Sequence, residues 1–263
     1  MVSREMPGKL SVIAFDGDDT LWHNERIFSV TQERFAALLA PYTGVQPLER
    51  LHDTEIRNLR LFGYGIKAFT LSMIETAVEV SEGTIGGRDI GAIVGWAKEM
   101  LQHPTELLPG VRETIEGLHD RYRLMVITKG DLFDQESKIA RSGLADLFHA
   151  IEIVSEKDKD TYRRVLQRHE IAPEEWLMVG NSVRSDILPA VALGGQAVHV
   201  PYDLTWVHEQ ADIGSEARDR VWSIERMDEL PWVLREIEER PSISNPQTDH
   251  PRSRARERLS APE

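Results

Sequence analysis

The chain has no cysteine among its 263 residues. This absence excludes disulfide bonds, zinc sites built on thiolates and thiol nucleophiles, and it leaves the redox compartment undecided. The sequence also lacks any run of 18 apolar residues, and the apolar stretch near the N-terminus is too short for a signal peptide. We therefore expect a cytoplasmic protein with no membrane partner.

Positive charge is in deficit as well, since 31 Lys and Arg residues face 44 Asp and Glu residues and give a net charge of −13. Nucleic-acid binding depends on neutralising phosphates, so we expect no nucleic-acid partner. Four arginines near the C-terminus alternate like a nucleic-acid-binding arm, but acidic neighbours dilute them and favour a solvated tail. A phosphorylated ligand would need a local cluster of positive charge.

The apolar residues that are present fall into short runs typical of buried parallel strands. These runs cover residues 10–15, 123–128, 150–154, 176–180 and 196–200. Helical patterns at 131–142, 159–170 and 185–193 separate the last four of them. This alternation predicts an α/β fold with a doubly wound, Rossmann-like parallel sheet. A short sixth strand at 219–224 and a closing helix at 227–239 are also expected.

The interval between the first two strands departs from this alternation. It carries helical periodicity at 26–41, 48–81 and 87–102, with Gly63 and Gly65 as a possible break in the second stretch. The pattern predicts an all-helical cap domain. We expect a core of residues 8–22 and 106–240, a helical cap of residues 23–105, and a disordered tail of residues 241–263, which is rich in Pro, Ser and Arg.

Carboxylates gather where the first strand ends. The chain reads Asp16-Gly-Asp18-Asp-Thr20 directly after the apolar run. Residues i and i+2 of a strand lie on the same side, so the carboxylates of Asp16 and Asp18 can approach one point. Their mutual repulsion would be relieved by a hard divalent cation.

Three more polar clusters follow later strands. They comprise Thr128, Lys129 and Gly130; Lys157 and Lys159; and Gly180, Asn181 and Asp186. The carboxyl ends of parallel strands meet at one edge of a doubly wound sheet, so we expect all four clusters to line one crevice.

Taken together, the four clusters resemble the fingerprint of the haloacid dehalogenase superfamily of hydrolases. The matching residues are Asp16-x-Asp18-x-Thr20, Thr128, Lys157 and Gly180-Asn181 with Asp186. The resemblance covers about residues 8–202, and the helical insertion corresponds to the family's cap.

The resemblance implies a role for each matched residue. Asp16 would be the nucleophile that forms an aspartyl-phosphate, and Asp18 would be the general acid and base. Thr128, Lys129, Gly130 and Lys157 would bind the phosphoryl group. Mg²⁺ would be held by Asp16, Asp186 and the main-chain carbonyl of Asp18.

Several of these assignments have structural alternatives. Asp16 and Asp18 could be turn residues, and Thr128 an ordinary strand threonine. Either Lys157 or Lys159 could be the active-site lysine, although the spacing to Tyr162 favours Lys157. The side chain of Lys129 could point to solvent.

The first and fourth clusters hold further ambiguities. Asp186 could simply be an acid in the first turn of its helix. Asn181 stands where the family usually has Asp, which removes one negative charge. Asp19 is expected to be solvated or to cap the following helix, and Thr20 to make a structural hydrogen bond.

Asp18 also separates the activities within the family, because dehalogenases lack an acid at this position and phosphatases keep it. We therefore predict a Mg²⁺-dependent phosphatase that acts on a small phosphorylated metabolite. A dehalogenase, a phosphomutase and a non-catalytic ligand-binding relative remain as alternatives. The cap would choose among sugar phosphates, phosphoglycolate-like acids and nucleotides, with His23, Asn24, Arg57, Arg60 and Lys67 as candidate contacts. The oligomeric state cannot be inferred.

Overall fold

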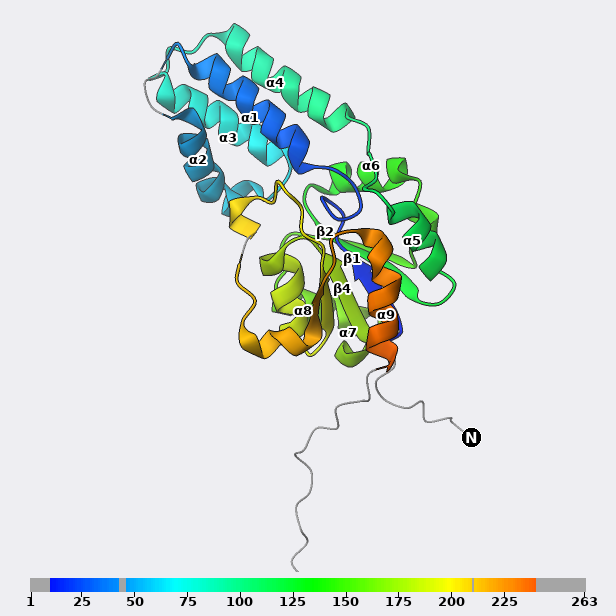
Figure 1. Cartoon of the computed structure of the whole chain (residues 1–263). Coiled ribbons are helices and arrows are strands. Elements are labelled where there is room, and N and C mark those ends of the chain that lie inside the picture. The colour runs from blue at the N-terminus through cyan, green and yellow to red at the C-terminus, as the bar shows by residue number, and fades with distance from the viewer. Residues whose placement is uncertain (1–9, 43–45, 210, 240–263) are drawn as a thin grey trace, which may run out of the picture.

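Six parallel strands form one sheet with the first strand, β1, near its centre (Figure 1). The structure is a computed structural model and describes residues 10–42, 46–209 and 211–239. The strands of this described part are β1 (Val12–Phe15), β2 (Arg123–Lys129), β3 (Ala150–Val154), β4 (Trp176–Gly180), β5 (Gln196–His199) and β6 (Val221–Ser223). Their spatial order is β3-β2-β1-β4-β5-β6. The order reverses at β1, and open α/β sheets bind ligands at the carboxyl ends of the strands beside such a reversal.

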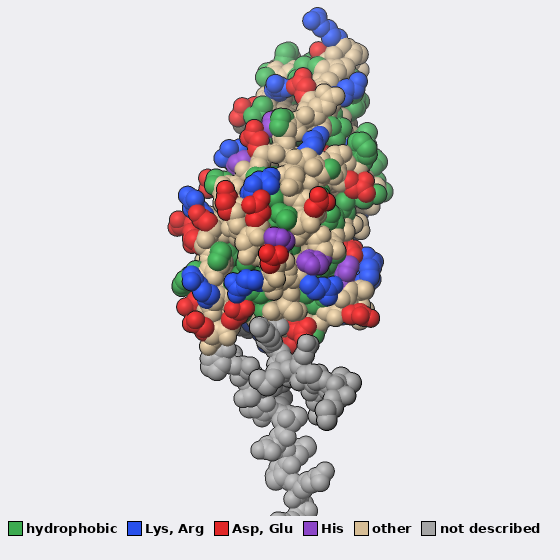
Figure 2. All heavy atoms as spheres, turned by 90° about the vertical axis from the view of Figure 1, so that its right-hand side faces the viewer, with side chains coloured by type: hydrophobic (Ala, Val, Ile, Leu, Met, Phe, Trp, Pro, Cys, Tyr) green, Lys and Arg blue, Asp and Glu red, His purple; other side chains and the backbone are tan. Residues whose placement is uncertain are grey.

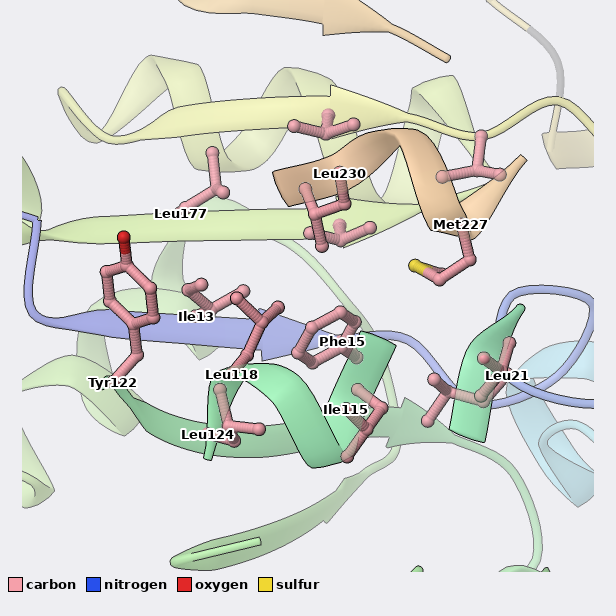
Figure 3. Close-up of a cluster of buried hydrophobic side chains, with 14 of the residues drawn as sticks. Ile13, Phe15, Leu21, Ile115, Leu118, Tyr122, Leu124, Leu177, Met227 and Leu230 are labelled. Carbon is pink, nitrogen blue, oxygen red and sulfur yellow. The ribbon is translucent and has the colours of Figure 1, made fainter. Parts of the chain in front are cut away.

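The side chains of β1 are buried on both faces of the sheet, as its continuous apolar sequence predicts. Ile13 and Phe15 pack on one face with residues of α5 (Val111–Leu118) and α9 (Leu230–Glu239), which Figure 3 shows in close-up. The alternate residues of β1 pack on the other face against α7 (Lys159–Arg168) and α8 (Leu188–Ala192). Burial of one such apolar side chain contributes about 1.5–3 kcal/mol, so the central strand is held firmly.

Of the five described helices between β1 and β2 in the sequence, α5 packs on the sheet, and we call the other four the helical insertion. They are α1 (Glu25–Leu39), α2 (Pro47–Phe62), α3 (Ile66–Val80) and α4 (Gly87–Gln102). Phe35, Met73 and Ile93 are fully buried in a hydrophobic cluster of their own. Figure 1 shows the four helices grouped beyond the end of the sheet from which the chain leaves β1. The insertion therefore faces the edge at which the predicted site residues gather.

The predicted strands and helices agree with the observed elements to within a few residues at their ends. The expected sixth strand is β6, and the stretch 48–81 is two helices that meet at Gly63 and Gly65, whose φ angles are +72° and +100°. The helix expected at 185–193 begins as a π-helical segment, Val183–Ile187, before α8. Single π-helical turns are frequent at functional sites. The predicted tail, 241–263, lies outside the described residues.

Two further features of the described residues are the distribution of charge on the surface and the character of the helices. Figure 2 shows the face on the right of Figure 1, where acidic and basic side chains are interspersed. Among the described helices, none combines the length and apolar character needed to span a bilayer.

Candidate active site

The chain turns sharply after β1, at the first polar cluster. The N–H of Asp16 donates to the carbonyl of Val179 at 2.9 Å, which ties the end of β1 to β4. The N–H of Leu21 then donates back to the carbonyl of Gly17 at 2.8 Å. A Cβ on Gly17 would lie only 2.8 Å from the ring of Trp22. Glycine is therefore required for this turn, which leaves Asp16 and Asp18 at the carboxyl end of the sheet.

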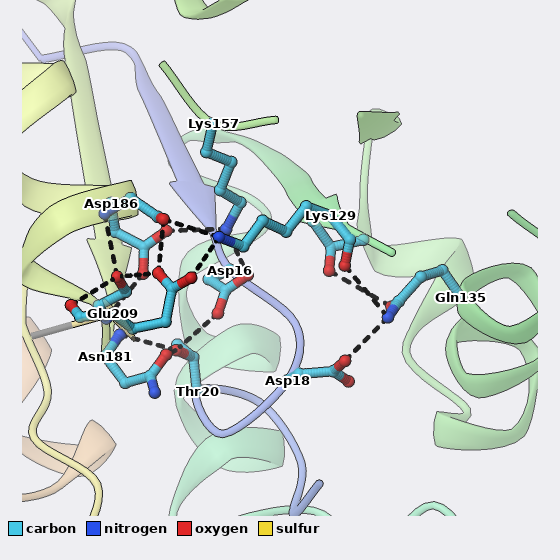
Figure 4. A network of polar contacts seen from close by, with 12 residues as sticks. Asp16, Asp18, Thr20, Lys129, Gln135, Lys157, Asn181, Asp186 and Glu209 are labelled. Atoms are coloured by element: carbon cyan, nitrogen blue, oxygen red, sulfur yellow. Dashed lines mark hydrogen bonds and ion pairs between the residues drawn. The ribbon is translucent and has the colours of Figure 1, made fainter. Parts of the chain in front are cut away.

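Lys157 connects the first and last polar clusters. Its ammonium group donates to Asp16 Oδ1 and, at 2.7 Å, to Asp186 Oδ1 (Figure 4). All three side chains are buried. Burial raises the pKa of Asp16 to about 7, although Lys157 partly opposes this rise. Burial alone would lower the pKa of Lys157, but the two carboxylates outweigh this effect and raise it.

Burial distinguishes the two candidate lysines. Lys159 begins α7 and is exposed, whereas Lys157 contacts Asp16 and Asp186. The spacing to Tyr162, which favoured Lys157, has a structural basis. The Tyr162 hydroxyl donates to the carbonyl of Ser185 at 3.0 Å and so connects α7 to the segment that carries Asp186.

Asp186 lies directly against the main chain of β4. A Cβ on Gly180 would lie 2.3 Å from the Asp186 carboxylate. The N–H of Ser182 donates to Asp186 Oδ2 at 2.9 Å, and this carboxylate also accepts from Lys157. Asp186 therefore lies in the first turn of its helical segment and also contacts Lys157. An acid in the first helical turn and a member of the charged cluster are thus compatible interpretations of this residue.

Asp18 has different neighbours from Asp16. Its carboxylate accepts from Trp22 Nε1 at 2.7 Å, Gln135 Nε2 at 2.8 Å and Lys138 Nζ at 3.0 Å. Gln135 and Lys138 belong to α6 (Leu132–Ser142), which follows β2. Lys138 is itself buried, and Asp18 and Asp134 raise its pKa against the effect of burial. The Asp18 carboxylate is thus fixed by three donors.

Thr128 is buried at the end of β2, with its hydroxyl 3.3 Å from Gln135 Oε1. Gly130 follows with a φ of +147°, and a Cβ there would lie 2.9 Å from Gln135 Nε2. The close approach of Gln135 to this loop explains why glycine follows Lys129. Thr128 and Gly130 are therefore placed beside Asp18 by the same glutamine.

Lys129 does not reach Asp16 or Asp18. Its ammonium group lies 2.5 Å from Glu209 Oε1, 2.8 Å from Ser185 Oγ and 4.2 Å from the centre of the Tyr64 ring. Glu209 also accepts from the hydroxyls of Ser182 and Ser185, each at 2.5 Å. Burial alone would raise the pKa of Glu209, but Lys129 and these hydroxyls lower it to about 2.

The other polar residues of the first motif have structural roles, as expected. The Thr20 hydroxyl accepts from the Asn181 N–H at 3.0 Å and lies 3.4 Å from Asp16 Oδ2. Asp19 accepts from the N–H groups of Asn24 and Glu25 and so caps the start of α1. Burial nevertheless raises the pKa of Asp19 to about 7.

A cavity of about 160 Å³ joins these groups to the helical insertion. From the sheet edge it is lined by all the predicted site residues, which are Asp16, Asp18, Thr128, Lys129, Gly130, Lys157 and Asp186. Of the candidate contacts in the insertion, Asn24 lines the cavity, whereas Arg57 pairs with Glu75 and Glu79 on the surface. Lys67 pairs with Asp131.

The family model for haloacid dehalogenase-like hydrolases matches residues 10–194, which is well over half of the chain and includes all four polar clusters. This chain is a haloacid dehalogenase-like hydrolase. The resemblance inferred from the motifs is thereby confirmed.

Known relatives agree with this family. The chain is 39% identical to a haloacid dehalogenase-like family hydrolase of Xanthomonas campestris, whose crystal structure superposes with a TM-score of 0.78 over 88% of this chain and 97% of that one. It is 28% identical over 201 residues, 74% of this chain and 82% of the relative, to the glyceraldehyde 3-phosphate phosphatase of Pyrococcus furiosus. A 2-haloacid dehalogenase of Pseudomonas syringae shares the fold at 21% identity and a TM-score of 0.59, over 86% and 99% of the two chains.

Sequence reasoning missed several polar residues that line the cavity, namely Tyr64, Gln135, Lys138, Ser182, Ser185 and Glu209. One local signal was present for two of them. Gln135 and Lys138 stand three apart on α6, on a face that also buries Ile139. Polar residues on a buried helix face indicate a polar site beneath it. No such signal marks Glu209, which ends a short 3₁₀ helix, Val207–Glu209, after β5.

The donor set of the hydrolase site suits a hard divalent cation. Among the described residues, no three Asp, Glu or His side chains gather as a metal-binding set. Mg²⁺, however, needs only one or two carboxylates, with water and phosphate oxygens completing its shell. Asp16 and Asp186 are two buried carboxylates that share one lysine, so an excess of negative charge remains there. The residues present therefore fit Mg²⁺.

Proposed function

We propose that this hydrolase is a Mg²⁺-dependent phosphatase that hydrolyses a small phosphomonoester through an aspartyl-phosphate. The observation that carries the proposal is that Asp16, Asp18, Thr128 and Lys157 line one cavity together with Asp186. A nucleophile, an acid–base group and a cation are the parts that phosphoryl transfer requires.

In the first step, a carboxylate oxygen of Asp16 attacks phosphorus and the bond to the ester oxygen breaks. Asp18 supplies the proton that the departing alkoxide takes up. In the second step, water attacks the phosphorus of the aspartyl-phosphate and loses a proton to Asp18. Inorganic phosphate leaves, and the Asp16 carboxylate is regenerated.

The remaining groups offset charge and hold these two aspartates. Lys157 lies between Asp16 and Asp186 and lowers the repulsion that an incoming phosphate would meet. Gln135 and Lys138 hold the Asp18 carboxylate in place. Bound at Asp16 and Asp186, Mg²⁺ would neutralise charge on the phosphoryl oxygens.

Two features favour a phosphatase over the other activities of the family. Halide leaves without a proton, so a dehalogenase has no use for the Asp18 carboxylate that three donors hold here. The relative from Pyrococcus furiosus is by name a phosphatase of a small phosphorylated aldehyde. A cavity of about 160 Å³ also suits a small ester.

Release of phosphate from p-nitrophenyl phosphate, followed with Mg²⁺ and with EDTA, tests the proposal. We expect Mg²⁺-dependent release by the natural protein and a loss on the order of a thousandfold or more in Asp16→Asn. Asp53→Asn is the matched control, because Asp53 is exposed on α2 and does not line the cavity.

Two results would overturn the proposal. One is full activity of Asp16→Asn, because this variant lacks the proposed nucleophile. The other is absence of release from any phosphate ester by the folded natural protein. Halide release from 2-chloropropionate under the same conditions would replace the phosphatase with a dehalogenase.

A further inference from the structure

The cavity continues from the catalytic aspartates into the helical insertion, where two glutamates line it. Glu25 belongs to the first turn of α1 and Glu55 to the middle of α2. The charge of Glu55 is one of the causes that raise the pKa of Glu25. Because neither belongs to the four family motifs, the proposed phosphoryl transfer gives them no role.

Neither glutamate has a hydrogen bond or an ion pair from its side chain to another described residue. Burial, reinforced by Asp19 and Glu55, raises the pKa of Glu25 to about 8. Burial likewise raises the pKa of Glu55 to about 7. Both carboxyl groups therefore line the cavity without an ion pair to a described cation.

The cations of the cavity are already paired. The described lining contains three lysines and neither arginine nor histidine. Lys157 is held by Asp16 and Asp186, Lys138 by Asp18 and Asp134, and Lys129 by Glu209. A carboxylate on the far end of a substrate would therefore meet acidic groups in the insertion and no free cation.

Aromatic rings line the cavity as well. Phe28 and Phe69 pack together, with ring centres 5.0 Å apart, and both line the cavity, as do Tyr64 and Trp206. Aromatic faces attract ammonium groups, and the attraction strengthens where water is excluded. An ammonium group beside these two carboxyl groups would lower their raised pKa values and favour their charged form, and the aromatic rings would attract the same cation.

We propose that Glu25 and Glu55 select phosphomonoesters whose far end carries an ammonium group. The phosphate end of such an aminoalkyl phosphate lies at Asp16 and Lys157, and its amine lies between the glutamates and the aromatic rings of the insertion. This assignment rests on the proposed phosphatase activity and names its substrate class. It excludes the phosphoglycolate-like acids that the sequence alone leaves open.

Three matched series of substrates test the proposal: aminoalkyl, hydroxyalkyl and carboxyalkyl phosphates of two to five carbons. For the natural protein with Mg²⁺, we expect kcat/KM to be at least about tenfold higher for the best aminoalkyl phosphate than for the hydroxyalkyl phosphate of the same length. The carboxyalkyl phosphates should be the poorest at every length.

The variants Glu25→Gln and Glu55→Gln assign the preference to these residues. Each should lower the ratio of kcat/KM for the amine to kcat/KM for the alcohol by about tenfold, chiefly through KM for the amine. If the glutamates had a merely structural role, each variant would lower kcat/KM equally for both substrates and leave the ratio unchanged. Glu33→Gln on α1 and Glu49→Gln on α2 are the controls, because both residues are exposed and lie outside the cavity.

The outcomes separate this inference from the proposed function. If the natural protein hydrolyses p-nitrophenyl phosphate but prefers no amine, the selection by Glu25 and Glu55 is refuted and the phosphatase stands. The same holds if both glutamine variants keep the natural ratio. If no phosphate ester is hydrolysed, the phosphatase proposal fails and this substrate assignment fails with it.

Discussion

Replacing Glu209 with glutamine should destabilise the protein, and the loss should depend on pH. Glu209 accepts from Lys129, Ser182 and Ser185, and together these contacts overcome its burial and lower its pKa to about 2 from an ordinary value of 4.5. A carboxyl group whose folded pKa is depressed stabilises the folded protein above its unfolded pKa. That stabilisation disappears as the pH falls toward the folded pKa.

The size of the effect follows from the two pKa values. Each pKa unit corresponds to about 1.36 kcal/mol, so ionised Glu209 contributes about 3 kcal/mol to the free energy of unfolding at pH 7. Near pH 3, which lies between the two values, about half of this contribution should remain. The charge-dependent part of the destabilisation by Glu209→Gln should shrink accordingly.

Urea unfolding at pH 7, 5, 4 and 3 measures this dependence. The difference in free energy of unfolding between the natural protein and Glu209→Gln removes the titration of all other groups. Glu225→Gln, at an exposed glutamate, controls for the loss of one surface charge. A difference below about 0.5 kcal/mol at pH 7, or one equally large at pH 7 and pH 3, would refute the reasoning.

Two further predictions concern the carboxylate pair. Gly180→Ala would place a methyl group against Asp186 and should lower both the free energy of unfolding and the rate of phosphate release. The control is Gly95→Ala in α4, where nothing lies within 4 Å of the added methyl group; it should raise the free energy of unfolding by about 0.5–1 kcal/mol. Equal effects of the two variants in urea unfolding would contradict this prediction. Lys157→Met should lower kcat for p-nitrophenyl phosphate by about a hundredfold or more, because it leaves two buried carboxylates without their cation, and Lys159→Met should leave kcat unchanged. The reverse ranking of the two lysines would overturn that assignment.

The sheet and its helices could be predicted from the sequence because their signals are local. The continuous apolar residues of β1 reflect burial on both faces, and the alternation of strands and helices specifies a parallel sheet. The break at Gly63 and Gly65 was visible because glycine adopts positive φ angles at little cost. The aspartates of the first motif could also be recognised, since they follow β1 directly.

The tertiary structure shows how Lys157 and Lys159 differ. The two stand two residues apart at the start of α7, and in the sequence only the spacing to Tyr162 favours Lys157. The difference arises because Lys157 is buried against carboxylates 141 and 29 residues away in the chain. Such distant partners meet only when β1, β3 and β4 assemble into the sheet.

The same reason explains Glu209, Glu25 and Glu55. In the sequence each is one acidic residue among 44, with nothing to mark it as buried, paired or unpaired. Folding brings Glu209 to Lys129 across 80 residues and places the other two in the same cavity, where none of the described lysines pairs with them. The sequence by itself determined the fold class and the motif residues, because periodicity and strand ends are local. The partners of each charge were decided by the tertiary structure, because they depend on which distant segments come into contact.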